Sequence, residues 1–250
     1  MKQVLLVTGS SGIAAATARL WAAENPVFIV GANAAECKDL AAQLEEADCA
    51  CADVREQVAV KNAVRACLDR FGRIDALFNV AGISARSAGD GPLHECKNEA
   101  WDLVMDVNAK GTFLMCREVL RVWTSNAQKG VILNTGSVLA QQPQGKYFAT
   151  VGYAASKGAI EAMSRSAAAY YAPAGIRINV IAPGLTRTPM SARAQADPHI
   201  ADYMAHKQPL AEGMLNPEDV AKAARFLLSG ESSPMTGQIV TVDGGWTVSE

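Results

Sequence analysis

The stretch VTGSSGIAAATARL, residues 7–20, decides the fold of this chain. It leads from a short apolar segment through two glycines into an alanine-rich segment that favours helix. Gly9 permits a sharp turn and Gly12 lets the backbone approach a pyrophosphate, with Ser11 and Ile13 on either side of it. Glycines between a strand and a helix are also ordinary turn residues. The rest of the chain therefore has to decide whether this turn binds a nucleotide.

Strand-like and helix-like segments alternate along the whole sequence. Because alternation of this kind produces right-handed βαβ crossovers, it predicts an α/β fold of the Rossmann type, with a doubly wound parallel sheet of about seven strands and helices on both faces. The expected strands cover 4–9, 27–32, 49–54, 74–82, 131–137, 176–184 and 239–245. The expected helices cover 14–24, 34–46, 56–71, 97–123, 152–172 and 217–229.

Composition narrows the function classes. The 250 residues are 50% hydrophobic and 19% charged with a net charge of −2, which favours one domain over 1–250 and gives no reason to expect a nucleic-acid partner. No signal-peptide core or apolar run of about 20 residues is present, so we expect a cytoplasmic protein with no membrane association. Six scattered cysteines lack metal-ligand spacing, and we expect no metal.

Small and polar residues follow the expected strands where each strand ends. In an open α/β sheet, ligands bind beyond the carboxyl ends of the strands. We therefore expect a site built from these strand ends. They are Thr8-Gly9, Ala32-Asn33, Asp53-Val54, Asn79-Val80-Ala81-Gly82, Ser137 and Pro183-Gly184.

The segment YAASK places Tyr153 and Lys157 four residues apart, on one face of an expected helix. A nearby ammonium favours a phenolate, so Lys157 is expected to bring the pKa of Tyr153 toward working pH and make Tyr153 a general acid/base. Ser137 could polarise a substrate carbonyl, and Asn108 could bind a water behind Lys157. Thr188, in the turn PGLTRTP, could bond a planar amide.

Together these stretches resemble the short-chain dehydrogenase/reductase family over the whole chain. The resemblance implies hydride transfer between a nicotinamide and an alcohol or ketone, with Tyr153 moving the substrate proton and Lys157 holding the nicotinamide ribose. It implies that Ser137 orients the substrate oxygen and that Asn108 anchors a relay water. The cofactor-binding residues that follow from the turns and the resemblance are Gly9, Ser11, Gly12, Ile13, Ala32, Asn33, Asp53, Val54, Asn79, Ala81, Gly82, Tyr153, Lys157, Pro183, Gly184, Thr186 and Thr188.

The sequence departs from the family pattern at two cofactor positions. Its glycine turn is one residue short, with alanine in place of the last glycine, and we expect altered rather than lost binding. At the end of the second strand, Ala32 is neither the acid that binds the ribose of NAD nor a base for the phosphate of NADP. Since no Arg or Lys occupies 10–11 or 32–33, NAD is favoured over NADP.

The substrate side is expected to be walled by 83–98, 138–152 and 185–215, with 185–215 forming a mobile, mostly apolar lid and with a loop over 141–152. Simple packing of the lid helix on the core is the competing interpretation. Arg86 and Arg187 are candidates to contact an anionic substrate group. The resemblance also implies a homodimer or homotetramer, built on the Tyr153 helix and the 100–122 helix.

Three functions are compatible with these observations. The first is an NAD(P)-dependent oxidoreductase of a small alcohol or ketone. The second is a regulator or scaffold that binds the cofactor without turnover, and the third is an isomerase or epimerase that recycles its cofactor. The complete set Asn108, Ser137, Tyr153 and Lys157 favours the first, and the single-domain length argues against the third.

Overall fold

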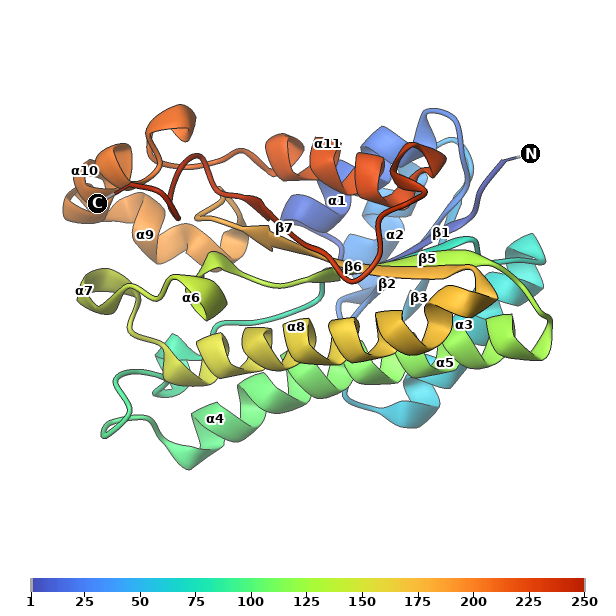
Figure 1. Ribbon diagram of the computed structural model, residues 1–250, viewed down its shortest axis with the longest axis horizontal. Helices are drawn as coiled ribbons and strands as arrows, with labels where there is room; N and C mark the ends of the chain where they lie inside the picture. The colour runs from blue at the N-terminus through green and yellow to red at the C-terminus, as the bar shows by residue number, and fades with distance from the viewer. Residues whose placement is uncertain (1, 250) are drawn as a thin grey trace.

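Seven parallel strands form one sheet in the computed structural model, which describes residues 2–249 (Figure 1). The strand order is β3-β2-β1-β4-β5-β6-β7, which confirms the predicted doubly wound α/β fold. The strands are β1 (Leu5–Thr8), β2 (Val27–Gly31), β3 (Ala47–Cys51), β4 (Ala76–Asn79), β5 (Gly130–Thr135), β6 (Ile176–Pro183) and β7 (Ile239–Val242).

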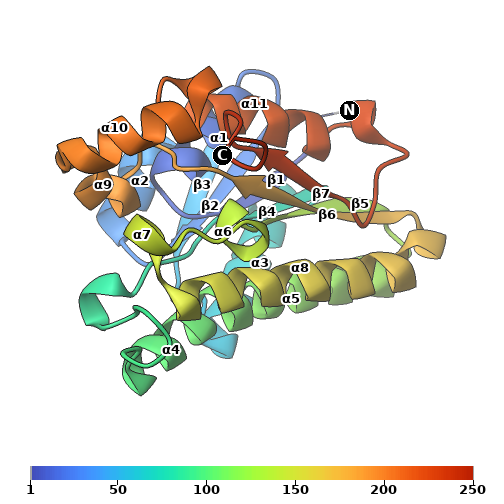
Figure 2. The same cartoon turned by 60° about the vertical axis from the view of Figure 1, so that its left-hand side comes forward.

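Helices cover both faces of the sheet. They are α1 (Gly12–Ala22), α2 (Ala34–Ala42), α3 (Gln57–Phe71), α4 (Asn98–Val104), α5 (Gly111–Ser125), α6 (Val138–Gln141), α7 (Gly145–Phe148), α8 (Val151–Tyr171), α9 (Ala192–Ala196), α10 (Pro198–Lys207) and α11 (Pro217–Leu228). Figures 1 and 2 show α5 and α8 side by side on one face and α1 and α11 on the other. Within the described chain, no helix has both the length and the apolar character needed to cross a membrane.

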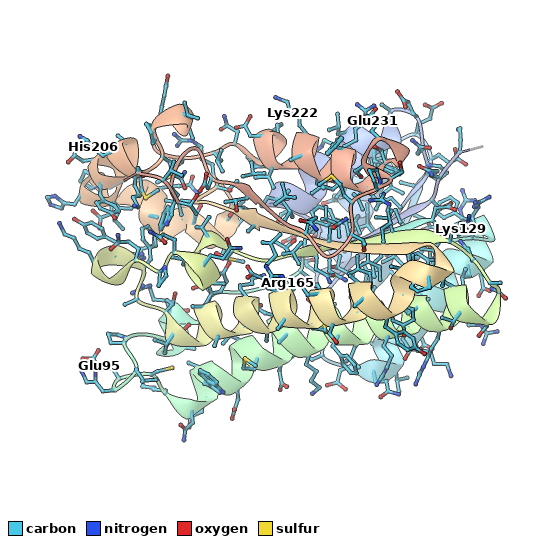
Figure 3. All side chains as sticks on the ribbon, in the orientation of Figure 1. Glu95, Lys129, Arg165, His206, Lys222 and Glu231 are labelled. Atoms are coloured by element: carbon cyan, nitrogen blue, oxygen red, sulfur yellow. The ribbon has the colours of Figure 1, made fainter. Side chains whose placement is uncertain are left out.

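Each face of the sheet has its own hydrophobic core. Leu6 of β1 points into the core that includes Val60, Met115 and Ala168, from α3, α5 and α8. Its neighbour Leu5 points into the opposite core, together with residues of α1, α2 and α11. This alternation follows from the two-residue period of a strand and explains why the buried strands are almost continuously apolar. Outside these cores, charged side chains such as Lys222 and Glu231 point away from the α11 layer (Figure 3).

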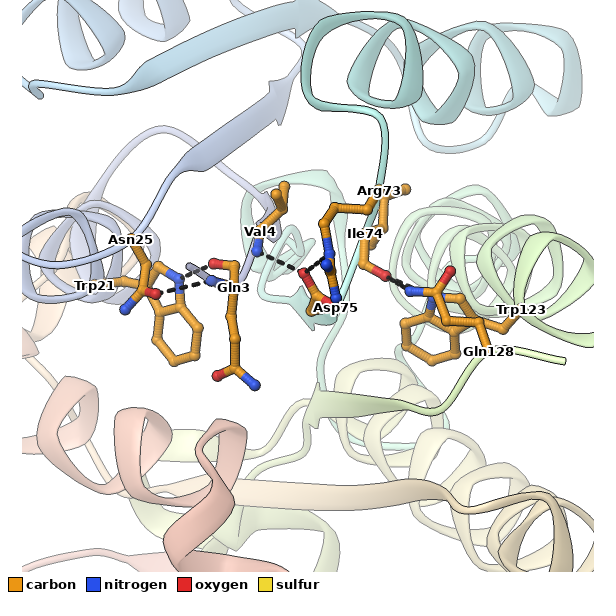
Figure 4. A network of polar contacts seen from close by, with 9 residues as sticks. All are labelled: Gln3, Val4, Trp21, Asn25, Arg73, Ile74, Asp75, Trp123 and Gln128. Atoms are coloured by element: carbon orange, nitrogen blue, oxygen red, sulfur yellow. Dashed lines mark hydrogen bonds and ion pairs between the residues drawn. The ribbon is translucent and has the colours of Figure 1, made fainter. Parts of the chain in front are cut away.

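A polar network ties the amino ends of β1 and β4 together (Figure 4). Val4 N donates to Asp75 Oδ2 at 2.9 Å, and the Asp75 carboxylate also accepts from Arg73. The indole of Trp123 donates to Ile74 O at 2.8 Å. These bonds hold the amino ends of β1 and β4 in register. The candidate site lies at the opposite ends of the strands, the carboxyl ends.

Two segments differ from the sequence prediction. The expected helix over 97–123 is interrupted by a π-helix, Met105–Lys110, which separates α4 from α5. A π-helical turn is rare and often lies at a functional site, and this one contains the buried Asn108. The expected loop over 141–152 contains the short helix α7, and α8 already begins at Val151. Helix α7 has only four residues, too few to show a helical period in the sequence.

Candidate active site

A cavity of about 720 Å³ lies beyond the carboxyl ends of β1, β4, β5 and β6. This is the crevice next to the point where the strand order reverses, between β1 and β4. Most of the residues predicted from the strand ends and turns line it. They are Gly9, Ser11, Gly12, Ile13, Ala81, Gly82, Ser137, Tyr153, Lys157, Pro183, Gly184, Thr186 and Thr188.

Several predicted residues lie outside the cavity wall. The carboxylate of Asp53 is paired with the Arg55 guanidinium, with a shortest N–O distance of 2.6 Å, and Val54 packs into the core. The buried Asn79 donates from Nδ2 to Asn134 Oδ1 at 2.8 Å. The remaining ones outside the wall are Ala32, Asn33 and Asn108. For Ala32, Asn33, Asp53, Val54 and Asn79, contact with the cofactor stays a prediction.

The glycine turn has the backbone geometry that glycine permits. Gly9 has φ +104° and Gly12 has φ +53°, and a Cβ added to Gly12 would lie 2.8 Å from Thr188 Cγ2. Ser11 is the N-cap of α1 but its side chain makes no capping bond, so the first N–H groups of α1 keep their capacity to bind an anion. Ala14, the alanine in place of the last glycine, is buried in the core between α1 and the sheet. Its methyl group is therefore accommodated.

Tyr153, Lys157 and Ser137 converge on the cavity from two elements. Tyr153 and Lys157 lie on successive turns of α8, and Lys157 Nζ is 5.6 Å from the centroid of the Tyr153 ring. Ser137 follows β5 and is the N-cap of α6, where its hydroxyl accepts a hydrogen bond from Leu139 N at 3.2 Å. Lys157 is 3% exposed, and its ammonium donates to Thr135 O at 2.9 Å.

Burial sets the protonation behaviour of this pair. Desolvation raises the pKa of Tyr153, and a hydrogen bond from Ser137 opposes that rise. Desolvation also lowers the pKa of Lys157 from 10.5 to about 8. The net shift of the Tyr153 pKa is thus opposite to the one expected from the lysine alone, because loss of hydration outweighs the hydrogen bond from Ser137.

Asn108 is held by the protein backbone. Its Oδ1 accepts from Ile83 N at 2.8 Å, and its Nδ2 donates to Ile83 O at 3.0 Å and to Ser156 Oγ at 2.9 Å. A Cβ added to Gly82 would lie 3.1 Å from Asn108 Oδ1 and 3.5 Å from Lys157 Nζ. Asn108 therefore lies next to Lys157, behind the cavity wall. Its predicted water-anchoring role stays a prediction.

Sequence reasoning missed Asp90, which positions the start of α8. The N-cap residue of α8, Thr150, makes no side-chain cap, and the Asp90 carboxylate instead accepts from Gly152 N and Tyr153 N at 2.9 Å each. A carboxylate at a helix N-terminus is stabilised by the helix dipole. The only hint in the sequence is the surrounding turn, since the partners are more than 60 residues apart.

At the far end of the cavity, the candidate arginines are Arg86 and Arg193 rather than Arg86 and Arg187. Arg86 and Arg193 line the wall, whereas Arg187 does not. Arg193 lies on the short helix α9, inside the expected lid segment, where no pattern of spacing distinguishes it from a solvated arginine. Apolar side chains complete this end of the wall. They include Val138, Leu139, Phe148, Leu185, Met190 and Trp246.

The residues present fit a nicotinamide dinucleotide. Any side chain at Gly12 would collide with Thr188, so the space between the turn and Thr188 requires glycine. Among the described residues, the buried Lys157 ammonium donates to one acceptor, Thr135 O, which leaves N–H donors for ribose hydroxyls. The α1 N-terminus supplies the anion-binding N–H groups. The glycine turn, the Lys157 ammonium and Tyr153 thus line one cavity.

Comparisons with known proteins agree with this geometry. Residues 7–247 match the family model described as enoyl-(acyl carrier protein) reductase. The chain is 38% identical over 98% of its length to cis-4-hydroxycyclohexanecarboxylate dehydrogenase of Sinomonas cyclohexanicum, covering 97% of that protein. It is 36% identical to 3beta-hydroxysteroid dehydrogenase 1 of Eggerthella lenta, with 98% and 94% of the two chains covered. Among solved structures, 3-ketoacyl-(acyl-carrier-protein) reductase from Brucella melitensis complexed with NADH matches with a TM-score of 0.87 and 31% identity over 98% of each chain.

Proposed function

Since the chain belongs to the short-chain dehydrogenase/reductase family and is an NAD(P)-dependent oxidoreductase of alcohol or ketone groups, we propose that Tyr153 is its general acid/base and NAD its preferred cofactor. The nicotinamide, when bound, accepts or donates the hydride. One observation carries the assignment: Tyr153, Ser137 and Lys157 line the same cavity as the glycine turn.

The side chains divide the work around the substrate oxygen. Tyr153 takes the hydroxyl proton during oxidation and returns it during reduction. Ser137 hydrogen-bonds the same oxygen and stabilises the ionised form of Tyr153, and Lys157 holds the nicotinamide ribose. Asn108, fixed by Ile83 and Ser156, anchors a water behind Lys157.

The cofactor lies along the strand ends in this proposal. Gly9, whose N–H donates to Val30 O, shapes the turn, and Ser11, Gly12 and Ile13 hold the pyrophosphate with backbone N–H groups. The remaining contacts are assigned to the adenosine end, the middle and the carboxamide end of the cofactor. Ala32, Asn33, Asp53 and Val54 lie toward the adenosine, Asn79, Ala81 and Gly82 line the middle, and Pro183, Gly184, Thr186 and Thr188 lie toward the carboxamide.

The preference for NAD is supported by Glu36 on α2. Its carboxylate accepts from Ser10 Oγ at 2.8 Å and from Asn33 Nδ2 at 2.9 Å, which places a negative charge between the glycine turn and the end of β2. Ala32, which follows β2, carries no charge of its own. Glu36 then supplies from the helix the charge that repels a 2′-phosphate.

Fluorescence titration with NADH and NADPH tests this preference. We expect the parent to bind NADH at least about tenfold more tightly, and Glu36→Gln to reduce that ratio severalfold by removing the repulsive charge. Asp39→Asn, a change of the same charge on the exposed side of α2, is the matched control and should leave the ratio as it is. Tighter binding of NADPH by the parent would overturn the preference for NAD.

For the substrate, we propose an alicyclic secondary alcohol or the matching ketone. The names of two relatives contain a hydroxylated ring, one a cyclohexanecarboxylate and one a steroid. The apolar side chains near Tyr153, among them Phe148 and Trp246 with ring centroids 5.5 Å apart, suit a ring of this kind. Oxidation by NAD, followed at the absorbance band of reduced nicotinamide across a panel of cyclic and linear alcohols, tests this. Faster turnover of the linear alcohols would contradict the ring preference.

We also propose a single catalytic domain over 1–250 with a lid at about 185–215, a cytoplasmic location and a homodimer or homotetramer. Ile200 and Met204 of α10 pack beside Trp246, which joins the proposed lid to the carboxyl-terminal segment. The partly exposed Trp101 and Phe113 lie on α4 and α5 and support an interface there.

A further inference from the structure

Two guanidinium groups meet at the substrate end of the cavity. Arg86 follows β4, and its Nη2 donates to Tyr147 O at 3.2 Å and to Ala149 O at 3.4 Å. Arg193 of α9 donates from Nη2 to the same Tyr147 carbonyl at 2.9 Å. Because one carbonyl accepts from both side chains, two positive charges lie close together on the cavity wall.

No carboxylate of the described residues forms an ion pair with either guanidinium. Burial and then the charge of Arg193 lower the pKa of Arg86, whereas Asp90 has the opposite effect. The Asp90 carboxylate is already used, because its two oxygens accept from Gly152 N and Tyr153 N. Neutral carbonyl oxygens therefore satisfy part of the donor capacity of Arg86 and Arg193, and Asp90 acts on Arg86 only without a direct ion pair.

Aromatic rings lie on one side of this pair, in which Arg86 is half-buried and Arg193 is exposed. The guanidinium carbon of Arg193 lies 5.9 Å from the centroid of the Phe148 ring, and Trp246 packs against that ring. The partial burial of Arg86 strengthens its attraction to an anion, whereas solvent screens the charge of the exposed Arg193. A ligand that fits here combines an apolar body with one negative group, and a planar carboxylate matches the guanidinium fork.

We propose that Arg86 and Arg193 bind a carboxylate carried by the substrate, on the opposite side of its ring from the hydroxyl that Tyr153 serves. This inference rests on the proposed function and names its substrate class as alicyclic hydroxy acids and the corresponding keto acids. The cofactor phosphates are the competing anion. The α1 N-terminus already serves them, whereas both arginines are tied to the Tyr147–Ala149 segment that leads into α8.

The test uses two unreactive probes that differ in charge. Cyclohexanecarboxylate and cyclohexanecarboxamide are titrated into the protein–NADH complex, and binding is followed by the change in nicotinamide fluorescence. We expect the parent to bind the carboxylate at least about tenfold more tightly than the amide, since a charge-assisted hydrogen bond is stronger than a neutral one. Equal affinity for the two probes, or no binding of either, overturns the proposal.

Three variants locate the effect. Arg193→Gln should reduce the carboxylate preference at least about fivefold with unchanged affinity for the amide and for NADH, while Arg193→Lys should keep part of it. Arg187→Gln, on the neighbouring turn but outside the cavity wall, is the matched control and should behave like the parent. Arg193 is chosen because Arg86 supports two loop carbonyls, and its replacement would also disturb the loop.

The outcomes separate this inference from the proposed function. Loss of NADH affinity in Arg193→Gln assigns the arginine to the cofactor and overturns the proposal. If the parent distinguishes the probes and loses this ability in Arg193→Gln but oxidises no alcohol, the carboxylate site stands and the proposed function fails. If it oxidises neutral alicyclic alcohols as efficiently as the matching hydroxy acids, the function stands and the carboxylate site fails.

Discussion

At the residue scale, the burial of Lys157 in the candidate site lowers the stability of the folded protein. Its ammonium is buried with one protein acceptor, and its pKa is lowered to about 8. A lysine whose pKa falls on folding binds its proton less well in the folded state, so it destabilises the protein below that pKa. The penalty disappears as the pH rises from the folded pKa toward the unfolded value of 10.5.

The pH dependence of stability therefore differs between the parent and Lys157→Met. Between about pH 7.5 and about pH 9.5, the free energy of unfolding of the parent should rise relative to that of the variant by about 2 kcal/mol. Urea unfolding at the two pH values measures the difference, because other titrating groups are common to both proteins. Lys61→Met, at an exposed position of α3, is the control and should show no such change. A constant difference for Lys157→Met would mean that the ammonium is not destabilised by folding.

The sequence was enough to predict the residues whose position follows from local structure. Tyr153 and Lys157 meet because they are one helical turn apart, and Ser137 joins them because it ends a neighbouring parallel strand. The contacts of Asn108 with Ile83, and of Asp90 with α8, could not be predicted. They depend on a π-helix and on a loop whose partners are distant in the chain.

At the scale of elements, the glycine turn and α8 use glycine for different reasons. Gly12 combines φ +53° with a close approach to Thr188, so an added methyl group meets both backbone strain and a clash. Gly158 lies within α8, and a Cβ there would meet nothing within 4 Å. The first glycine is required by geometry, whereas the second weakens its helix.

The matched substitutions Gly12→Ala and Gly158→Ala should have opposite effects. Gly12→Ala should weaken NADH binding about tenfold and lower stability by roughly 1 kcal/mol, because the strained turn rearranges. Gly158→Ala should leave NADH binding unchanged and raise stability by about 0.5–1 kcal/mol, since alanine loses less backbone entropy in a helix. NADH titration and thermal unfolding of both variants measure these effects. Unchanged NADH affinity in Gly12→Ala would show that the turn does not hold the cofactor.

The short elements near the substrate could not be predicted from the sequence. Helices α6, α7 and α9 have four or five residues each, too few to show a period. Their positions depend on tertiary contacts, such as the bond from Arg193 to Tyr147 O between α9 and α7. For the same reason the sequence favoured Arg187 and gave no reason to select Arg193.

At the scale of the whole molecule, the order of strands determines where the chemistry takes place. The order in which the chain adds strands reverses between β1 and β4, and the cavity lies beside this point at the carboxyl ends of the strands. The alternating pattern of strands and helices was enough to predict this architecture, because right-handed crossovers leave few other topologies. The segments that contact the substrate lie outside that pattern. The fold could therefore be predicted from the sequence, whereas the substrate specificity could not.

The substitution Tyr153→Phe tests the central claim most directly, because it removes one hydroxyl and keeps the ring that packs in the wall. The measurement is the growth of reduced-nicotinamide absorbance when the protein is mixed with NAD and an alicyclic secondary alcohol, alongside titration with NADH. The account predicts turnover by the parent, a loss of at least about a hundredfold in Tyr153→Phe, and equal NADH affinity in both proteins. Turnover by Tyr153→Phe at the parent rate would contradict it.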